Sequence, residues 1–197
     1  MSDKNLNPFI LFKNWFESAS EKEINDPNAM CLSTVDNNNC PHSRMVLLKG
    51  YNESGFRFFT NYESNKSIDI EQNKNVALNF HWKSLQRQIR IEGLIDKLNS
   101  DQSDEYYNSR HYMSRIGAWA SDQSRPLKNR EELEEKIEMY KEKYPDENSV
   151  PRPPHLGEVL SLNLKNLSFG QDMPHRIHQR DIFELNNQEW VKQTLNP

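Results

Sequence analysis

An apolar stripe near the start of the chain has the spacing of an α-helix. Its four main residues recur every three or four positions: Phe9, Phe12, Phe16 and Ala19. Asn7 and Pro8 come just before the stripe, and these residue types favour the cap and the first turn of a helix. The pattern predicts a helix over residues 8–22 that packs one face against the rest of the protein.

From residue 28 the apolar positions alternate with a period of two, which is typical of β-strands. Three such runs, residues 29–36, 40–51 and 56–62, are joined by the short polar turns DNNN and NESG. Because turns this short connect antiparallel neighbours, we expect the three runs to form a meander.

The same region continues with a short helix that begins at a Ser64 cap, followed by two more strands over residues 76–82 and 87–98. Residues 28–98 therefore hold the main strands. No parallel sheet is indicated.

Residues 43–50, with the sequence SRMVLLKG, combine an apolar centre with a fixed charge at each end. The four consecutive apolar residues 45–48 predict a strand buried on both faces. Arg44 and Lys49 flank them with Cα atoms about 16 Å apart in extended chain, and the period of two sends their side chains to opposite faces. This spacing suits an elongated anionic ligand, or two ligands end to end. The alternative is a core strand whose two ends emerge into water.

After residue 98 the pattern becomes helical, over residues 100–145. One helix is expected to end near Arg110 and a longer one to begin near Asn129, which has the residue type of a helix cap. Residues 111–126 between them form a linker rich in aromatic, Arg, Ser and Gln side chains, a composition that favours a binding loop. Residues 151–197 return to short alternating runs that end in a strand around Trp190.

These elements predict a mainly β (α+β) fold, an antiparallel barrel of about six to eight strands with flanking helices. The length of 197 residues suits one domain that spans the whole chain. The 25 Lys and Arg residues against 29 Asp and Glu give a net charge of -4, which argues against nucleic acid and anionic membranes as partners.

Neither a membrane-spanning run nor a signal peptide is evident, so we expect a soluble cytoplasmic protein. Cys31 and Cys40 form no CxxC pair and are expected to be free thiols. His175 and His178 lack a third ligand at a metal-binding spacing, so no metal site is expected.

Seven segments in order identify a resemblance to the pyridoxine (pyridoxamine) 5′-phosphate oxidases: NAMCLSTVD, SRMVLLKGY, FFTNYES, RQIRIEG, SRIGAWASDQS, PRPPH and RIHQR. The resemblance runs from about Pro8 to Pro197. It implies a split-barrel flavoprotein, a homodimer with FMN at the subunit interface. It also implies oxidation of pyridoxamine or pyridoxine phosphate to pyridoxal phosphate, with hydride transfer to FMN and with O₂ as the acceptor that yields H₂O₂.

The resemblance also assigns residues to the two ligands. The residues implied to bind FMN are Arg44, Met45, Val46, Leu47, Leu48, Lys49, Phe59, Thr60, Lys66, Gln88, Gln123, Ser124 and Arg180. The residues implied to bind the phosphorylated vitamin are Lys49, Tyr106, Arg110, Ser114, Arg176 and His178. Tyr106 and Arg110 are four apart, which would place both on one helix face. Arg176 and His178 are the candidate catalytic residues, expected on one face of a strand because they alternate.

The sequence departs from the family in places that bear on FMN binding. Asn65 stands where relatives have an Arg before Lys66, Gly170 stands where they have a Trp that contacts FMN, and Leu156 replaces a Trp. The register also slips by one residue around residues 158–166, and an Arg-rich N-terminal extension is not evident. Two alternatives therefore stay open beside an active oxidase. One is a diverged carrier or sensor of FMN or pyridoxal phosphate, and the other is a split-barrel flavin reductase with another substrate.

Overall fold

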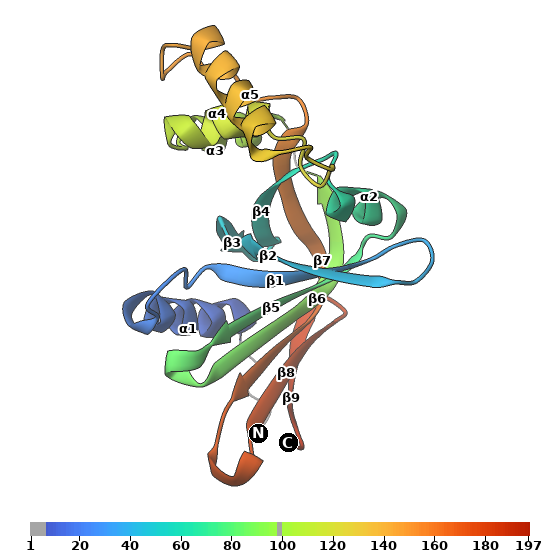
Figure 1. The fold of residues 1–197 in the computed structure, drawn as a ribbon. Helices are drawn as coiled ribbons and strands as arrows, with labels where there is room; N and C mark the ends of the chain where they lie inside the picture. Colours follow the sequence, from blue (N-terminus) through green and yellow to red (C-terminus); the bar gives the residue numbers. More distant parts are fainter. Residues whose placement is uncertain (1–6, 98–99) are drawn as a thin grey trace.

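The computed structural model describes residues 7–97 and 100–197, and within them the chain forms one antiparallel sheet with helices around it (Figure 1). The strands are β1 (Ala29–Val35), β2 (Pro41–Leu47), β3 (Gly50–Asn52), β4 (Gly55–Asn61), β5 (Asn75–Trp82), β6 (Arg87–Lys97), β7 (Leu156–Gln171), β8 (Gln179–Asn186) and β9 (Glu189–Leu195). The helices are α1 (Pro8–Lys22), α2 (Asn65–Gln72), α3 (Ser100–Asn108), α4 (Tyr112–Ala120) and α5 (Arg130–Lys143).

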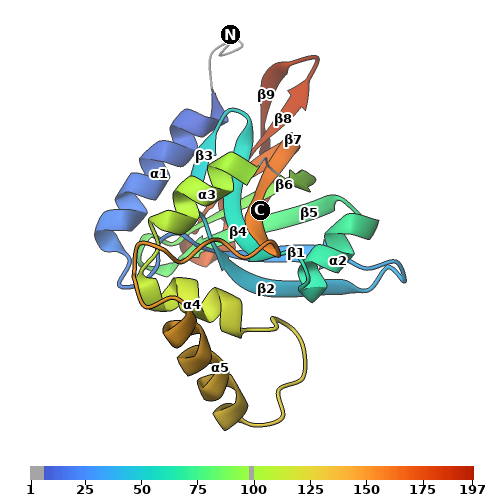
Figure 2. The ribbon, with the colours of Figure 1, turned by 90° about the horizontal axis from the view of Figure 1, so that it is seen from above.

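The strands follow the spatial order β2-β1-β5-β6-β7-β4-β3, and β8 and β9 continue from the second half of β7. In Figure 1, α3, α4 and α5 stand at one end of the molecule, whereas the β8–β9 hairpin extends at the other. Viewed from above in Figure 2, α1 and α2 flank the strands on opposite sides. The described residues form nine strands, one more than the upper end of the predicted range of about six to eight, and the predicted fold class is confirmed.

The core lies where α1 packs on the sheet. The Phe12 ring contacts Phe56 edge-on at 4.8 Å and Phe80 at 5.5 Å between centroids, and all three side chains are fully buried. Fully burying a Phe side chain is worth about 1.5–3 kcal/mol, so the predicted amphipathic stripe is the main contribution of α1 to stability. Its start is also as predicted, because the Asn7 side chain accepts a hydrogen bond from the Phe9 amide.

Two predictions about residues 40–51 are wrong. The run is not one strand, because β2 ends at Leu47 and the chain turns there. The Leu48 amide donates to the Asn28 carbonyl at 2.8 Å, and the Lys49 amide donates to the Arg57 carbonyl at 2.8 Å. Consequently β3 pairs with β4 at the opposite edge of the sheet, and the three runs form no meander.

The strand β2 is not buried on both faces either. Met45 is 63% exposed and Leu47 is 41% exposed, since β2 forms an edge of the sheet in the single chain. Leu48 is buried in the core at 4% exposed, and the partly buried Val46 packs against the core. An exposed apolar edge of this kind is a site where another chain can pack.

The C-terminal half contains two further differences. The predicted linker over residues 111–126 is partly helical, because α4 occupies Tyr112–Ala120. The strand β7 is 16 residues long, with its first part paired to β4 and its last part paired to β8. Register shifts opposite Glu92 and Gly93 show bulges in β7 within residues 158–166, the stretch where the sequence slips against the family pattern.

Candidate active site

A cavity of about 640 Å³ opens between β2, β4, α3 and the loop after α4. Most of the predicted ligand-binding residues line it: Met45, Val46, Leu47, Lys49, Phe59, Thr60, Lys66, Tyr106, Arg110, Ser114 and Gln123. They come from segments far apart in the chain. The fold therefore brings together eleven residues that the family resemblance names.

One end of the cavity is formed by the start of α2. The Lys66 ammonium donates to the Ser64 hydroxyl and to the Gln123 side-chain oxygen, both at 2.8 Å. Ser64 makes no side-chain cap to the helix, contrary to its predicted role, because its hydroxyl donates to the Asn61 carbonyl instead. Burial, with a further contribution from the positive charge of Arg44, lowers the pKa of Lys66 to about 8. Such a depressed lysine pKa indicates a place where a negative charge would be favourable.

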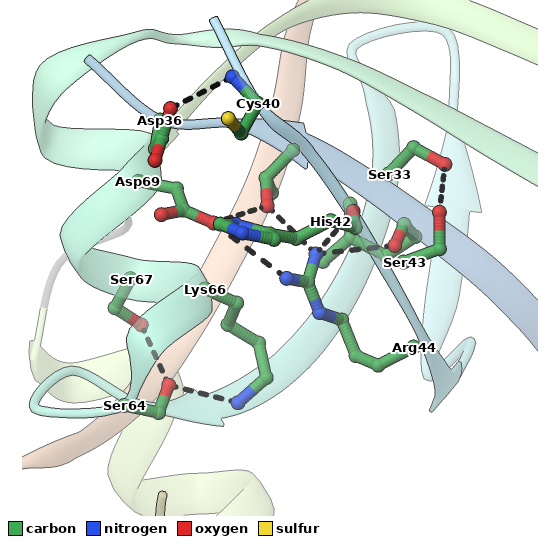
Figure 3. Close-up of polar contacts among 12 residues, drawn as sticks. Ser33, Asp36, Cys40, His42, Ser43, Arg44, Ser64, Lys66, Ser67 and Asp69 are labelled. Carbon is green, nitrogen blue, oxygen red and sulfur yellow. Dashed lines mark hydrogen bonds and ion pairs between the residues drawn. The ribbon is translucent and has the colours of Figure 1, made fainter. Parts of the chain in front are cut away.

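Arg44 lies beside this end in a network around a buried carboxylate, seen in Figure 3. Its guanidinium donates to the Thr34 hydroxyl at 2.8 Å and lies 3.6 Å from the Asp69 carboxylate. Asp69 is 5% exposed and also accepts from Thr34 at 2.6 Å, with the His42 Nδ1 at 3.0 Å. The network holds Arg44 in place between β2 and α2.

The other end of the cavity is formed by β4, α3 and the start of α4. The Phe59 and Tyr106 rings stack with centroids 3.6 Å apart, and the Lys49 ammonium lies 5.4 Å from the centre of the Tyr106 ring. Arg110 lies beyond the end of α3, so the prediction that it shares a helix face with Tyr106 is wrong, although both residues line the cavity. This end therefore carries two cations, Lys49 and Arg110.

Sequence reasoning missed several lining residues, including Ser109 and His111. The His111 side chain accepts a hydrogen bond from the Met113 amide and caps α4. The sequence carries little signal for this helix, because His is not among the residue types that favour an N-cap. Ser114 is brought into the cavity by the same first turn of α4.

A second group of predicted residues lies outside this cavity in the single chain. Gln88, Gly170 and Arg180 are direct neighbours in one row across β6, β7 and β8. Arg176 and His178 lie in the segment before β8. The β8–β9 hairpin extends at the end of the molecule opposite α3 (Figure 1). Arg176 has φ 61° in a short 3₁₀ turn, so the expectation that it shares a strand face with His178 is wrong.

The remaining predicted residues have other surroundings. Leu48 is part of the core, and Ser124 lies in the exposed loop after α4 with φ 70°. Cys31 and Cys40 are free thiols. Among residues 7–97 and 100–197, no cluster of three or more His, Cys, Asp or Glu side chains could hold a metal ion. No helix in this described part of the chain has the length and apolar character that crossing a membrane requires.

Comparison with known proteins agrees with this geometry. Residues 16–144 match the family described as pyridoxamine 5′-phosphate oxidase. A pyridoxine/pyridoxamine 5′-phosphate oxidase from Pelagibacter ubique is 46% identical over 98% of this chain and 92% of its own length. A protein of the same name from Bartonella quintana is 48% identical over 96% of this chain and 92% of its own length.

Solved structures share the fold. PhzG from Burkholderia lata, solved in complex with tetrahydrophenazine-1-carboxylic acid, superposes with a TM-score of 0.91 at 23% identity, covering 99% of this chain and 95% of that one. A pyridoxamine 5′-phosphate oxidase-related, FMN-binding protein from Nostoc punctiforme gives a TM-score of 0.77 at 18% identity, covering 98% of this chain and 100% of that one. Sequence, fold and cavity agree, and the chain belongs to the pyridoxamine 5′-phosphate oxidase family of oxidoreductases.

Proposed function

We propose that this protein is a cytoplasmic, FMN-dependent oxidase that converts pyridoxamine 5′-phosphate or pyridoxine 5′-phosphate to pyridoxal 5′-phosphate, with O₂ as acceptor and H₂O₂ as product. The observation that carries the proposal is that one cavity has a cationic group at each end. Lys66 stands at one end beside Arg44, and Lys49 with Arg110 stands at the other. Two separate cationic ends suit two phosphate-bearing molecules that meet in the middle.

The residues present fit FMN at the end formed by α2. A phosphate monoester carries close to two negative charges at neutral pH, and Lys66 and the first amides of α2 would hold it. The Gln123 amide and the Thr60 hydroxyl can each donate and accept, as the edge of a flavin ring requires. The depressed pKa of Lys66 supports this assignment, because a bound phosphate would offset the cost of its buried charge.

The phosphorylated vitamin fits the other end. Lys49, Arg110 and Ser114 would bind its phosphate, and the stacked Phe59 and Tyr106 rings provide a flat apolar wall. Bound FMN supplies the redox chemistry, accepting a hydride from the vitamin and passing the electrons to O₂. The chain's own part is to hold the two molecules in the orientation that the transfer needs.

The proposal includes a homodimer in which a second copy of the chain completes each site. Gln88, Arg176, His178 and Arg180 are not among the residues that line the cavity of their own chain, whereas the exposed Met45 and Leu47 of the edge strand β2 do line it. If β2 packs on a second copy, the partner's residues would meet the cavity there. Arg176 and His178 of that copy would then orient the pyridine ring and assist proton removal.

The test is an absorbance spectrum of the purified protein followed by turnover under air. We expect a yellow protein, or one that takes up FMN. It should convert pyridoxamine 5′-phosphate, water and O₂ to pyridoxal 5′-phosphate, with one ammonia and one H₂O₂ formed per aldehyde. Without oxygen, the substrate should bleach the flavin. Tight FMN binding with no bleaching by either vitamin phosphate would instead favour the alternative of a diverged carrier or sensor without turnover.

A further inference from the structure

The loop after α4 is folded back onto the start of α2. The Arg125 amide donates to the Asp122 carbonyl at 3.0 Å, and Ser124 has φ 70°, so residues 122–125 form a tight turn. The turn is attached to α2 at two points. One is the hydrogen bond from Lys66 to Gln123, and the other is the Arg125 side chain.

The Arg125 guanidinium lies against the residues that precede and open α2. Its Nη2 donates to the Glu63 carbonyl at 2.9 Å, and its Nη1 lies 3.5 Å from the Asn65 side-chain oxygen. Both acceptors are neutral, so neither offsets the positive charge of the guanidinium. The acidic side chain of the same turn, Asp122, is paired with Lys136 at 2.8 Å.

The residue at position 65 leaves the first turn of α2 short of positive charge, which a guanidinium from another segment can supply. Asn65 carries a short neutral amide next to Lys66, so the first turn of α2 supplies one cation from its own sequence. Arg125 adds a second cation here, because its guanidinium contacts Asn65, the residue directly before Lys66. This is the N-terminal end of α2, where backbone amides point outward. A planar guanidinium also matches two oxygens of a phosphate, which a lysine cannot do.

We propose that Arg125 is a cofactor-binding residue of this chain, and that its guanidinium binds the FMN phosphate together with Lys66 in place of an arginine at position 65. The inference rests on the proposed function, because it assumes that FMN occupies the α2 end of the cavity. Arg125 is exposed and both acceptors of its guanidinium are neutral, so the side chain can exchange them for phosphate oxygens.

The experiment compares dissociation constants of FMN and of riboflavin, which has the same ring and no phosphate, by quenching of flavin fluorescence. Arg125→Ala is expected to weaken FMN about 5- to 20-fold and to change riboflavin less than about 2-fold, because the lost contact involves the phosphate only. The FMN affinity of Arg125→Lys should lie between those of wild type and Arg125→Ala, since lysine keeps the positive charge but lacks the paired N–H donors of a guanidinium. Arg130→Ala is the matched control, because Arg130 follows in the same region but pairs with Glu134.

A double variant tests the replacement directly. The double variant Arg125→Ala with Asn65→Arg should bind FMN as tightly as the wild type, and its affinity for riboflavin should be unchanged. Equal weakening of both flavins by Arg125→Ala would mean that the residue only shapes the loop, and unchanged FMN affinity in Arg125→Ala and Arg125→Lys would likewise overturn the inference. Wild-type protein that binds FMN no tighter than riboflavin would overturn the proposed phosphate site as well.

Discussion

The Lys66 ammonium donates a hydrogen bond of 2.8 Å to the Gln123 side-chain oxygen, which joins the first turn of α2 to a loop 57 positions further along the chain. Both residues line the cavity. The ammonium that would face the cofactor phosphate is therefore already oriented, and its protonation state decides how well it binds an anion.

This arrangement predicts a pH dependence of FMN affinity. The pKa of Lys66 in the free protein is about 8, chiefly because the side chain is buried, whereas a bound phosphate would raise it again. Binding then takes up a proton above pH 8, so affinity should fall as pH rises from 8 to 9, by up to about tenfold. The FMN phosphate is fully ionised over this range and contributes no change.

The control for this titration is Lys66→Arg, whose guanidinium stays charged throughout. Its FMN affinity should be flat between pH 8 and 9. A wild-type affinity that is equally flat would show that Lys66 does not contact the phosphate.

The proposed homodimer, in which each site is shared between two chains, predicts complementation between inactive variants. Lys49→Ala removes a cation from the cavity, and Arg176→Ala removes a residue of the distant group. Random mixing of the two gives half mixed dimers, each with one intact site, so activity should return to about a quarter of wild type. The unfolded variants are mixed, refolded with FMN and assayed for pyridoxal 5′-phosphate. No recovery, with dimers of about twice the 23.3 kDa chain mass present, would argue for sites within single chains.

Removing the candidate catalytic side chains should reduce turnover and leave the cofactor bound. Arg176→Ala and His178→Ala are each expected to lower kcat/KM about 10²- to 10³-fold, the usual effect of losing one well-placed polar group. His175→Ala is the neighbouring control and should retain near-normal activity. FMN content, measured at its visible absorbance, should be equal in all three. Normal kcat/KM in the first two variants would remove them from the mechanism.

The spacing of apolar residues predicted most helices and strands. It failed where tertiary contacts determine where a strand ends. The stripe of Phe9, Phe12, Phe16 and Ala19 is α1, and the Asn129 side chain accepts from the Glu132 amide at the start of α5, as expected. The break of β2 at Leu48 depends on its bond to Asn28, which no local pattern reveals.

For the site, local sequence showed charge and could not show proximity. The charges of Arg44 and Lys49 predict an anion-binding strand, whereas only the family resemblance adds Tyr106 and Gln123 from distant segments. Apart from Lys66 itself, no cation near position 65 in the sequence indicates what could compensate for Asn65. The fold instead places Arg125 against Asn65, through a loop whose position depends on α4.

The Gln88, Gly170 and Arg180 row predicts that an aromatic side chain at position 170 tightens FMN. A Cβ there would meet only ordinary contacts with Gln88, at 3.7 and 3.8 Å, so the backbone tolerates a side chain. Gly170→Trp should tighten FMN about 2- to 12-fold, corresponding to an aromatic contact of about 0.5–1.5 kcal/mol. Gly170→Leu supplies bulk without an aromatic ring and should give a smaller change. Equal affinities in both variants and wild type would mean that position 170 does not reach the flavin.

The buried Asp69 network predicts a stability effect. Asp69→Ala removes the acceptor of the Thr34 hydroxyl and the carboxylate that pairs with the Arg44 guanidinium at 3.6 Å, so the free energy of unfolding should fall by about 3 kcal/mol. Denaturant unfolding measures it, with exposed Asp172→Ala as the control at less than about 0.5 kcal/mol. A loss as small as that of the control would mean that Asp69 is replaced by water.

The long strand β7 contributes to two different parts of the molecule, one through each of its halves. Its first residues pair with β4 next to Phe59 and Thr60, its last residues carry Gly170, and the bulges opposite Glu92 and Gly93 lie between. An inserted or deleted residue can be absorbed at the bulges without rotating the side chains at either end. The two halves of the strand are therefore free to accumulate changes at different rates over evolutionary time, and a designer could exchange the segment after the bulges between relatives while leaving the cavity wall unchanged.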